Sequence, residues 1–307
     1  KFNSFLKEFL EDLTSIPVFE KEKFQTQLEN KIKSIKNMRT MSPLVLSEYI
    51  LLSNSFPMVY SINELNSAIK NINYKEFKDY QRLFLKTFEP TIFYYGNFKD
   101  HLKINISKSK IKDYPPIRRK EIKCDLLVDH PNLEENNNGI SVYYSVGKFN
   151  PKLIVTLDLF MNIVENSFYD FLRTKSQLGY LVKMSTKLIK KDYFMVQRVQ
   201  SRFKIKVVLE KINKFNSMAN SIINKLNKKS LDNWKDTLKK KYTEKETKTT
   251  DVINLLGHEI FNKEYMFNRY QIMARMVDNI TIEDIKQFYI NYLIKNKNSF
   301  KILVKGN

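Results

Sequence analysis

Ten residues decide how this sequence is interpreted: Phe171-Leu-Arg-Thr-Lys-Ser-Gln-Leu-Gly-Tyr180. They join the end of a predicted helix to the start of a predicted strand. Gly179 allows the backbone to turn sharply or to pass close to another segment. Arg173 and Tyr180 could donate hydrogen bonds to a peptide carbonyl or to a developing oxyanion. The spacing alone favours a simpler interpretation, a helix C-terminus where Gly is the stop and Arg offsets the helix dipole.

The sequence around this segment alternates between helical and extended patterns. Two β-rich runs follow it, at 180–187 and 193–201, and a half-buried strand with apolar residues at every second position precedes it at 140–146. A helix opens at Pro151, and two or three long helices follow the strands, with their apolar residues between 212 and 260. Helices gathered in runs beside strands predict an α+β fold, with the helices on one face of a mostly antiparallel sheet.

The first third of the chain is predicted to be helical and to end in a strand. An apolar stretch, Leu44–Leu52, is predicted to be a buried helix, and Thr91–Tyr95 is β-branched and aromatic. The order of cap, helix, strand and Gly-Asn ending found at 71–97 recurs at 279–307, 208 to 210 residues further on. Such recurrence indicates a duplicated α/β unit. We therefore expect two homologous domains, at 1–120 including a connector and at 121–307, with the first truncated at its N-terminus.

Composition excludes several classes of protein. The 307 residues carry a formal net charge of +20, but lysine supplies most of it, whereas reading bases favours arginine. The densest basic run, 235–248, is also interrupted by acids. Nucleic-acid binding is therefore an alternative and not the leading hypothesis. No apolar stretch is long enough for a membrane helix. The single cysteine, Cys124, excludes a disulfide framework and fits a reducing compartment such as the cytoplasm.

The three histidines do not form a metal site in the sequence. A zinc peptidase needs two His and a Glu on one helix face, as H-E-x-x-H or H-x-x-E-H. His258-Glu259 begins the first pattern, but Asn262 stands where the second His is needed, and neither His101 nor His130 completes the inverted pattern. We expect all three to be surface or helix-cap residues. No zinc site is expected in this chain.

The segment Leu172-Arg-Thr-Lys-Ser-Gln-Leu-Gly-Tyr180 resembles the L-R-T-x-x-Q-L-G-Y segment of the insulin-degrading-enzyme branch of the pitrilysin-type zinc peptidases. That segment lies in the last of four homologous domains. Weaker similarity extends outward to Phe24-Gln-Thr-Gln, to the strand end at 92–97 and to Asn138–Tyr144, which is similar to the first strand of the fourth domain.

The resemblance implies that this chain is most of the C-terminal half of a zinc endopeptidase, lacking the first strands of the third domain. Such a half closes the catalytic chamber, while the N-terminal half is the partner that binds zinc through H-x-x-E-H. By the same resemblance, Arg173 and Tyr180 contact short peptide substrates and assist the transition state, Tyr169 lines a substrate subsite, and Gly179 belongs to the binding segment. The fragment alone would be inactive.

Three other hypotheses stay open. They are a scaffold that supports a catalytic partner without contributing to catalysis, a homodimer, and a lysine-rich nucleic-acid-binding protein.

Overall fold

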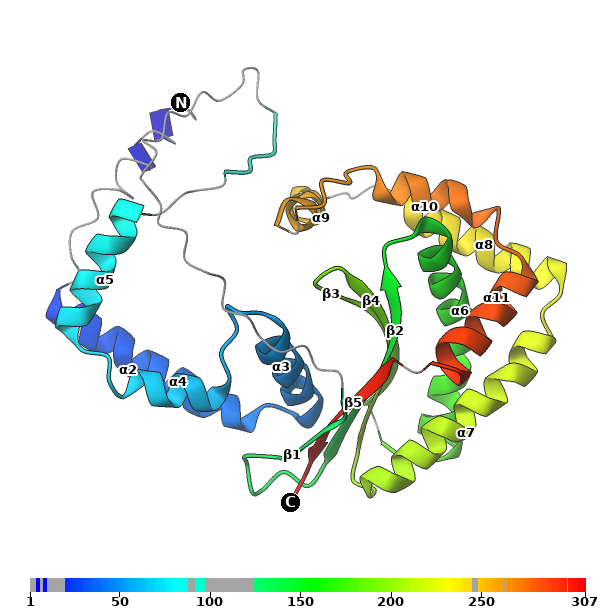
Figure 1. Ribbon diagram of the computed structural model, residues 1–307, viewed down its shortest axis with the longest axis horizontal. Coiled ribbons are helices and arrows are strands. Elements are labelled where there is room, and N and C mark those ends of the chain that lie inside the picture. Colours follow the sequence, from blue (N-terminus) through cyan, green and yellow to red (C-terminus); the bar gives the residue numbers. More distant parts are fainter. Residues whose placement is uncertain are drawn as a thin grey trace.

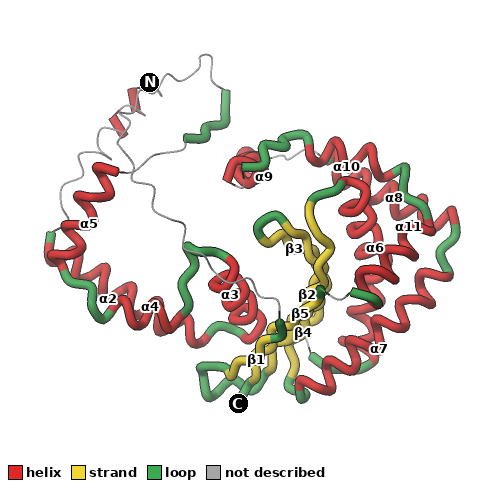
Figure 2. Tube along the Cα trace, in the orientation of Figure 1, coloured by secondary structure: helices red, strands yellow, loops and turns green. Residues whose placement is uncertain are grey.

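The computed structural model describes residues 4–5, 8–9, 20–87, 92–97, 124–179, 181–244, 248–261, 263–296 and 298–307. Helices cover most of the first third, and a sheet flanked by helices forms the rest (Figures 1 and 2). The labelled α-helices are α2 (Lys21–Asn37), α3 (Pro43–Ser55), α4 (Ile62–Ile69), α5 (Tyr74–Thr87), α6 (Pro151–Tyr169), α7 (Ile205–Asn224), α8 (Lys228–Thr243), α9 (Thr249–Phe261), α10 (Arg269–Val277) and α11 (Ile282–Phe288). None of the described helices is both long and apolar enough to cross a membrane.

Five strands form one mixed sheet in the order β1-β5-β2-β4-β3. The strands are β1 (Leu126–Asp129), β2 (Asn138–Lys148), β3 (Leu181–Ile189), β4 (Asp192–Ser201) and β5 (Ser299–Lys305). All neighbours are antiparallel except β1 and β5, which run parallel. The predicted α+β class and the mostly antiparallel sheet are therefore confirmed, and β3 is an edge strand.

The main core lies between the sheet and helices α6, α7, α8, α10 and α11. Helix α6 is buried along most of its length, because α8, α10 and α11 pack on it from one side and the sheet covers the other. A closed ring of hydrogen bonds joins Tyr144 of β2, Gln197 of β4 and Asn216 of α7, with distances of 2.7 to 3.0 Å. Each of these buried polar groups is thus satisfied, which fixes α7 on the sheet.

The opposite face of the sheet is covered by α3, a placement that the expected one-sided arrangement did not include. Leu51 of α3 packs with Tyr143, Phe300 and other apolar residues of this face. The hydroxyls of Ser47 and Ser141 also lie 2.8 Å apart between helix and sheet. Strand β2 is consequently buried on both faces, and its prediction as a half-buried strand is wrong. The burial predicted for residues 44–52 is confirmed, although Val45 is half exposed.

Helices α2, α4 and α5 of the first third pack on one another, whereas α3 packs on the sheet. Phe24 of α2 lies 5.5 Å and 5.1 Å from the rings of Tyr74 and Phe77. The strand predicted at Thr91–Tyr95 is not formed at residues 92–95, which have no regular structure, and Thr91 lies outside the described residues. A strand needs a neighbour to bond its backbone. The described residues of the first third supply helices and no other strand, so this stretch has no ladder to join.

His130 does not behave as the expected surface histidine. It is buried, its Nε2 donates to the Met41 carbonyl at 2.8 Å, and the Asn132 backbone N–H donates to its Nδ1 at 3.1 Å. It therefore joins the start of the C-terminal unit to the segment before α3.

Candidate functional site

The predicted site segment begins where α6 ends. Asn150 caps α6 by accepting the Leu153 N–H at 3.1 Å, and Pro151 occupies the first turn, where its missing N–H costs nothing. The helix then widens into a π-helical segment, Asp170–Lys175. Phe168 and Leu172 are fully buried and anchor this end of the helix in the core. π-Helical turns occur frequently at functional sites.

The chain leaves the π-helical segment through a tight loop. The Leu178 N–H donates to the Leu172 carbonyl at 3.0 Å, and Gln177 adopts the left-handed conformation with φ of 49°. A Cβ atom on Gly179 would lie 2.0 Å from the Gln200 carbonyl oxygen. Gly179 is therefore required by a close approach to β4 of the same chain. The Ser201 hydroxyl also donates to the Leu178 carbonyl, which holds the loop on that strand.

Arg173 closes this loop from the side. Its Nη1 donates to the Gly179 carbonyl at 2.8 Å, and its side chain is half-buried. Asp170 does not neutralise it, because that carboxylate bonds Lys175 at 2.9 Å, and this hydrogen bond lowers the pKa of Asp170. Among the described residues no carboxylate lies within ion-pair distance of Arg173. A guanidinium carries five N–H donors in a planar fork, so this one is oriented by its bond to Gly179 and has further donors to offer.

The other predicted site residues are placed less completely. Tyr169 is the last residue of α6, and its side chain is 45% exposed. It therefore stands at the surface one turn before Arg173. Tyr180 lies outside the described residues, so its role stays a prediction.

The described histidines and acids are not grouped to hold a zinc ion. Zinc is held by three or four His, Cys, Asp or Glu side chains. Within the ranges that the structure describes, no three such residues are grouped to hold a metal. His130 uses both ring nitrogens on neighbouring backbone groups, and His101 lies outside those ranges.

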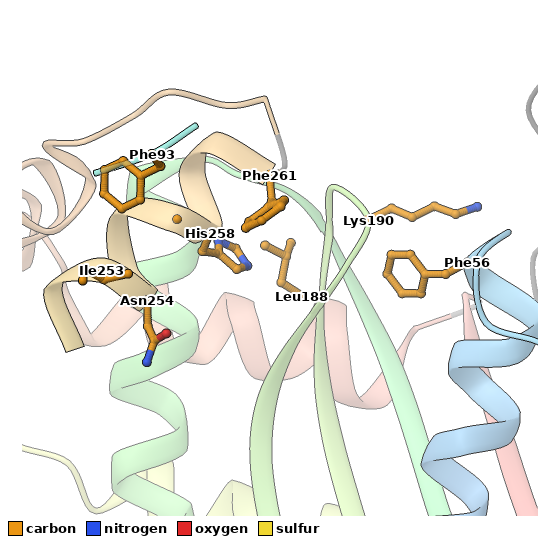
Figure 3. A pocket seen from close by; sticks show the side chains of 9 residues that line it. Phe56, Phe93, Leu188, Lys190, Ile253, Asn254, His258 and Phe261 are labelled. Atoms are coloured by element: carbon orange, nitrogen blue, oxygen red, sulfur yellow. The ribbon is translucent and has the colours of Figure 1, made fainter. Parts of the chain in front are cut away.

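A cavity of about 480 Å³, which sequence reasoning missed, lies between α9 and the β3–β4 hairpin (Figure 3). Its walls come from α9 (Ile253, Asn254, Gly257, His258 and Phe261), the hairpin (Leu188 and Lys190), Phe56 and Phe93. Four separate segments contribute, so no local motif could reveal it. One signal was available: Gly257 is a helix-interior glycine, where glycine is unfavourable, and a Cβ there would meet nothing within 4 Å.

A buried ion pair joins α9 to the start of α10. Arg269 donates from Nε to Glu259 at 2.6 Å and also pairs with Glu264. Its guanidinium lies 4.3 Å from the centre of the Phe149 ring, and its Nη1 donates to the Tyr193 hydroxyl at 3.3 Å. Breaking a buried pair is costly, so this contact fixes the wall of the cavity.

Comparison with known proteins agrees with this architecture. Residues 159–255 match the family described as PQQ synthase PqqF-like, C-terminal lobe domain 4. That range includes the end of α6, the Arg173 loop, β3, β4, α7 and α8.

Similarity to individual proteins extends over nearly the whole chain. A nardilysin-like protein of Arabidopsis thaliana is 23% identical over 289 residues, which is 88% of this chain and 28% of that protein. Human insulin-degrading enzyme is 21% identical, over 92% of this chain and 29% of the enzyme. The crystal structure of pitrilysin superposes with a TM-score of 0.76 at 13% identity, over 99% of this chain and 33% of that one.

The chain thus spans less than a third of the length of these curated relatives. Over most of its length it is homologous to insulin-degrading enzyme and to a nardilysin-like protein, it shares the fold of pitrilysin, and its described residues contain no zinc-binding group.

Proposed function

We propose that this chain is the non-zinc-binding C-terminal half of an insulinase-like metalloendopeptidase, and that it clamps peptide substrates through Arg173 and Tyr180. The observation that carries the proposal is the hydrogen bond from Arg173 to the Gly179 carbonyl. It holds a half-buried guanidinium in one orientation, with no carboxylate of the described residues to neutralise it. Such a donor is suited to a peptide carbonyl or to the oxyanion that develops from it.

In this proposal Arg173 acts by positioning. Its fork would hold a substrate carbonyl while the Gly179 bond limits its rotation, so little side-chain entropy is lost on binding. Tyr180 would add a phenolic donor, and the exposed Tyr169 would offer an aromatic surface for a substrate side chain. Residues of this chain would bind and orient the peptide. Bond cleavage would belong to a zinc-binding N-terminal half of the longer protein, because the described residues here do not fit zinc.

The two-domain organisation, with a truncated first domain at 1–120 and a second at 121–307, is part of the same proposal. Helices α5 and α11 begin 208 residues apart, and each contributes to an aromatic pair; the second pair joins the last residue of α11 to the π-helical segment Tyr289–Ile294 that follows it. Phe288 and Tyr292 stack with centroids 4.8 Å apart, and Tyr80 and Phe84 stack at 6.2 Å. Phe288 is 3% exposed because α6 covers it, whereas Tyr80 is 65% exposed. The aromatic pair of α5 is thus as apolar as the buried pair but is exposed to solvent. This exposure supports packing of α5 against a further pitrilysin-type domain.

The alternative within this fold is an inactive scaffold that supports a catalytic partner. It is favoured by the lack of a metal-binding group among the described residues. A lysine-rich nucleic-acid-binding protein is the alternative from another class, and the net charge of +20 is its only support.

Hydrolysis of short peptides by the full-length protein, with and without a zinc chelator, tests the proposal. Chelator-sensitive hydrolysis is expected. Full-length protein that binds zinc stoichiometrically but cleaves no peptide would favour the scaffold. Salt-dependent DNA retention that persists in Arg173→Ala would favour nucleic-acid binding.

A further inference from the structure

Two cations lie directly opposite each other on neighbouring strands of the sheet. Lys183 of β3 pairs in register with Arg198 of β4. Directly opposed residues point to the same face of a sheet, and like charges in this arrangement repel. Arg198 contacts α3 through the Leu44 carbonyl, at 3.0 Å, so this is the face that α3 partly covers. The edge strand is left open beyond α3, and Lys183 is exposed there.

The charge of this cluster is not balanced by the described residues. Lys187, four residues after Lys183 and on the same face, pairs with Glu48 of α3, and Arg198 bonds the same carboxylate at 3.2 Å. Lys183 has no ion-pair partner among the described residues. Two cations therefore share one carboxylate, and the third cation of the cluster has none among the described residues. In addition, no acceptor of the described residues forms a hydrogen bond with the buried Nε of Arg198.

The cluster continues from the Arg173 loop along β3. Leu181, the first residue of β3, lies opposite Gln200, the residue that Gly179 approaches. Lys183 is the third residue of β3, and a strand rises about 3.3 Å per residue, so Lys183 lies roughly 7 Å along the strand from Leu181. An extended peptide covers that distance with about two residues. Arg173 follows α6 on the other face of the sheet, so a peptide held there must run along the open edge of β3, where alternate side chains point to the face that carries Lys183.

We propose that Lys183 and Arg198 form an anion subsite that receives an Asp or Glu side chain of the peptide clamped at Arg173. The inference rests on the proposed function, because it adds a preference for acidic peptides to that clamp. The bound carboxylate would relieve the repulsion between the two opposed cations. Glu48 would hold Arg198 and Lys187 in place beside it.

Peptide binding tests this subsite separately from cleavage. A fluorescent peptide with one Glu, and its Gln analogue, are titrated by anisotropy into the full-length protein with a zinc chelator present. The Glu is moved along the peptide in a series. We expect one position where Glu binds about tenfold more tightly than Gln. Lys183→Gln should remove that preference, and Lys183→Glu should transfer it to a peptide with Lys at that position.

Lys206→Gln is the matched control, since Lys206 is exposed on α7, across the sheet from α3. Equal loss in Lys183→Gln and Lys206→Gln would attribute the preference to the general positive charge and overturn the subsite. No Glu preference at any position would overturn it as well. The proposed clamp is tested separately with the Gln peptide. If Arg173→Ala lowers binding of that peptide, the clamp is supported even when the subsite is not. If Arg173→Ala leaves that binding unchanged, the clamp itself is contradicted.

Discussion

The Nη1 atom of Arg173 lies 2.8 Å from the Gly179 carbonyl oxygen, so the two most distinctive residues of the site segment are bonded to each other. The bond closes the loop between the π-helical end of α6 and strand β3. Arg173 thereby acquires a fixed orientation, and Gly179 fixes the loop against β4. Arg173 and Gly179 are six residues apart in the sequence, and their hydrogen bond makes the loop between them one rigid structure at the edge of the sheet.

Gly179→Ala is expected to destabilise the fold. An added Cβ would lie 2.0 Å from the Gln200 carbonyl oxygen, which is backbone and has little freedom to move. The loop or the end of β4 must shift, at a cost of about 1–3 kcal/mol in the free energy of unfolding. Urea unfolding followed by circular dichroism measures it. Unchanged stability would show that the loop is not pressed against β4.

Gly257→Ala is expected to have the opposite effect, and it serves as the matched control for the same chemical change. Gly257 is in the interior of α9, and a Cβ there would meet nothing within 4 Å. Alanine should raise the free energy of unfolding by about 0.5–1 kcal/mol, because it lowers the backbone entropy of the unfolded chain. A loss of stability in the same unfolding assay would mean that the cavity wall is already closed.

Arg269→Ala should be the most destabilising of these changes. Arg269 and Glu259 have side chains 11% and 5% exposed, and removing the arginine would leave a buried carboxylate without its partner. Breaking such a pair costs about 3–5 kcal/mol. Lys239→Ala, which breaks an exposed pair with Asp278, should cost less than about 1 kcal/mol. Similar losses in the two variants would show that the Arg269 pair is solvated.

Stability should fall in acid, in part through Glu259. Burial raises the pKa of Glu259, but hydrogen bonds from Arg269 and from the Met266 backbone outweigh it, so that the pKa lies below its ordinary value of 4.5. A carboxyl with a lower pKa in the folded state contributes stability above the unfolded-state pKa, and loses it as the pH falls through the folded one.

The variant Glu259→Gln should therefore be less stable than the parent at pH 7 and show a shallower loss between pH 5 and pH 3. Urea midpoints across this range measure it. Burial raises the pKa of Asp158, which acts in the opposite direction in both proteins. Parallel pH profiles would contradict the assignment to Glu259.

Local sequence patterns predicted the helices and strands whose formation depends on residues close together in the sequence. The helix at 44–52 follows from Pro43 and an apolar run, and the strands around Tyr144 and Val196 follow from alternation and β-branching. The burial of Tyr143 could not be predicted, because α3, about 90 residues earlier, covers it. For the same reason the aromatic run at 92–95 was overinterpreted: extended propensity makes a strand only where another strand offers its backbone.

Only part of the candidate site could likewise be predicted from the sequence. Arg173 and Gly179 could be selected because they share one segment, although the simple helix stop and the functional interpretation had the same spacing. The cavity beside α9 and the opposition of Lys183 and Arg198 depend on register between strands and on packing of distant segments. Glu259 was noted only as a failed zinc motif, and its pairing with Arg269 required the fold.

The most direct measurement of the central claim is peptide turnover by the full-length protein with Arg173→Ala, beside Lys175→Ala as a control. Lys175 is two residues away, exposed, and bonded to Asp170. We expect Arg173→Ala to lower kcat/KM about 10²-fold, with zinc content unchanged and the free energy of unfolding lowered by only about 1 kcal/mol, and Lys175→Ala to retain activity. Normal turnover in folded Arg173→Ala protein would contradict the role of Arg173 as the substrate clamp.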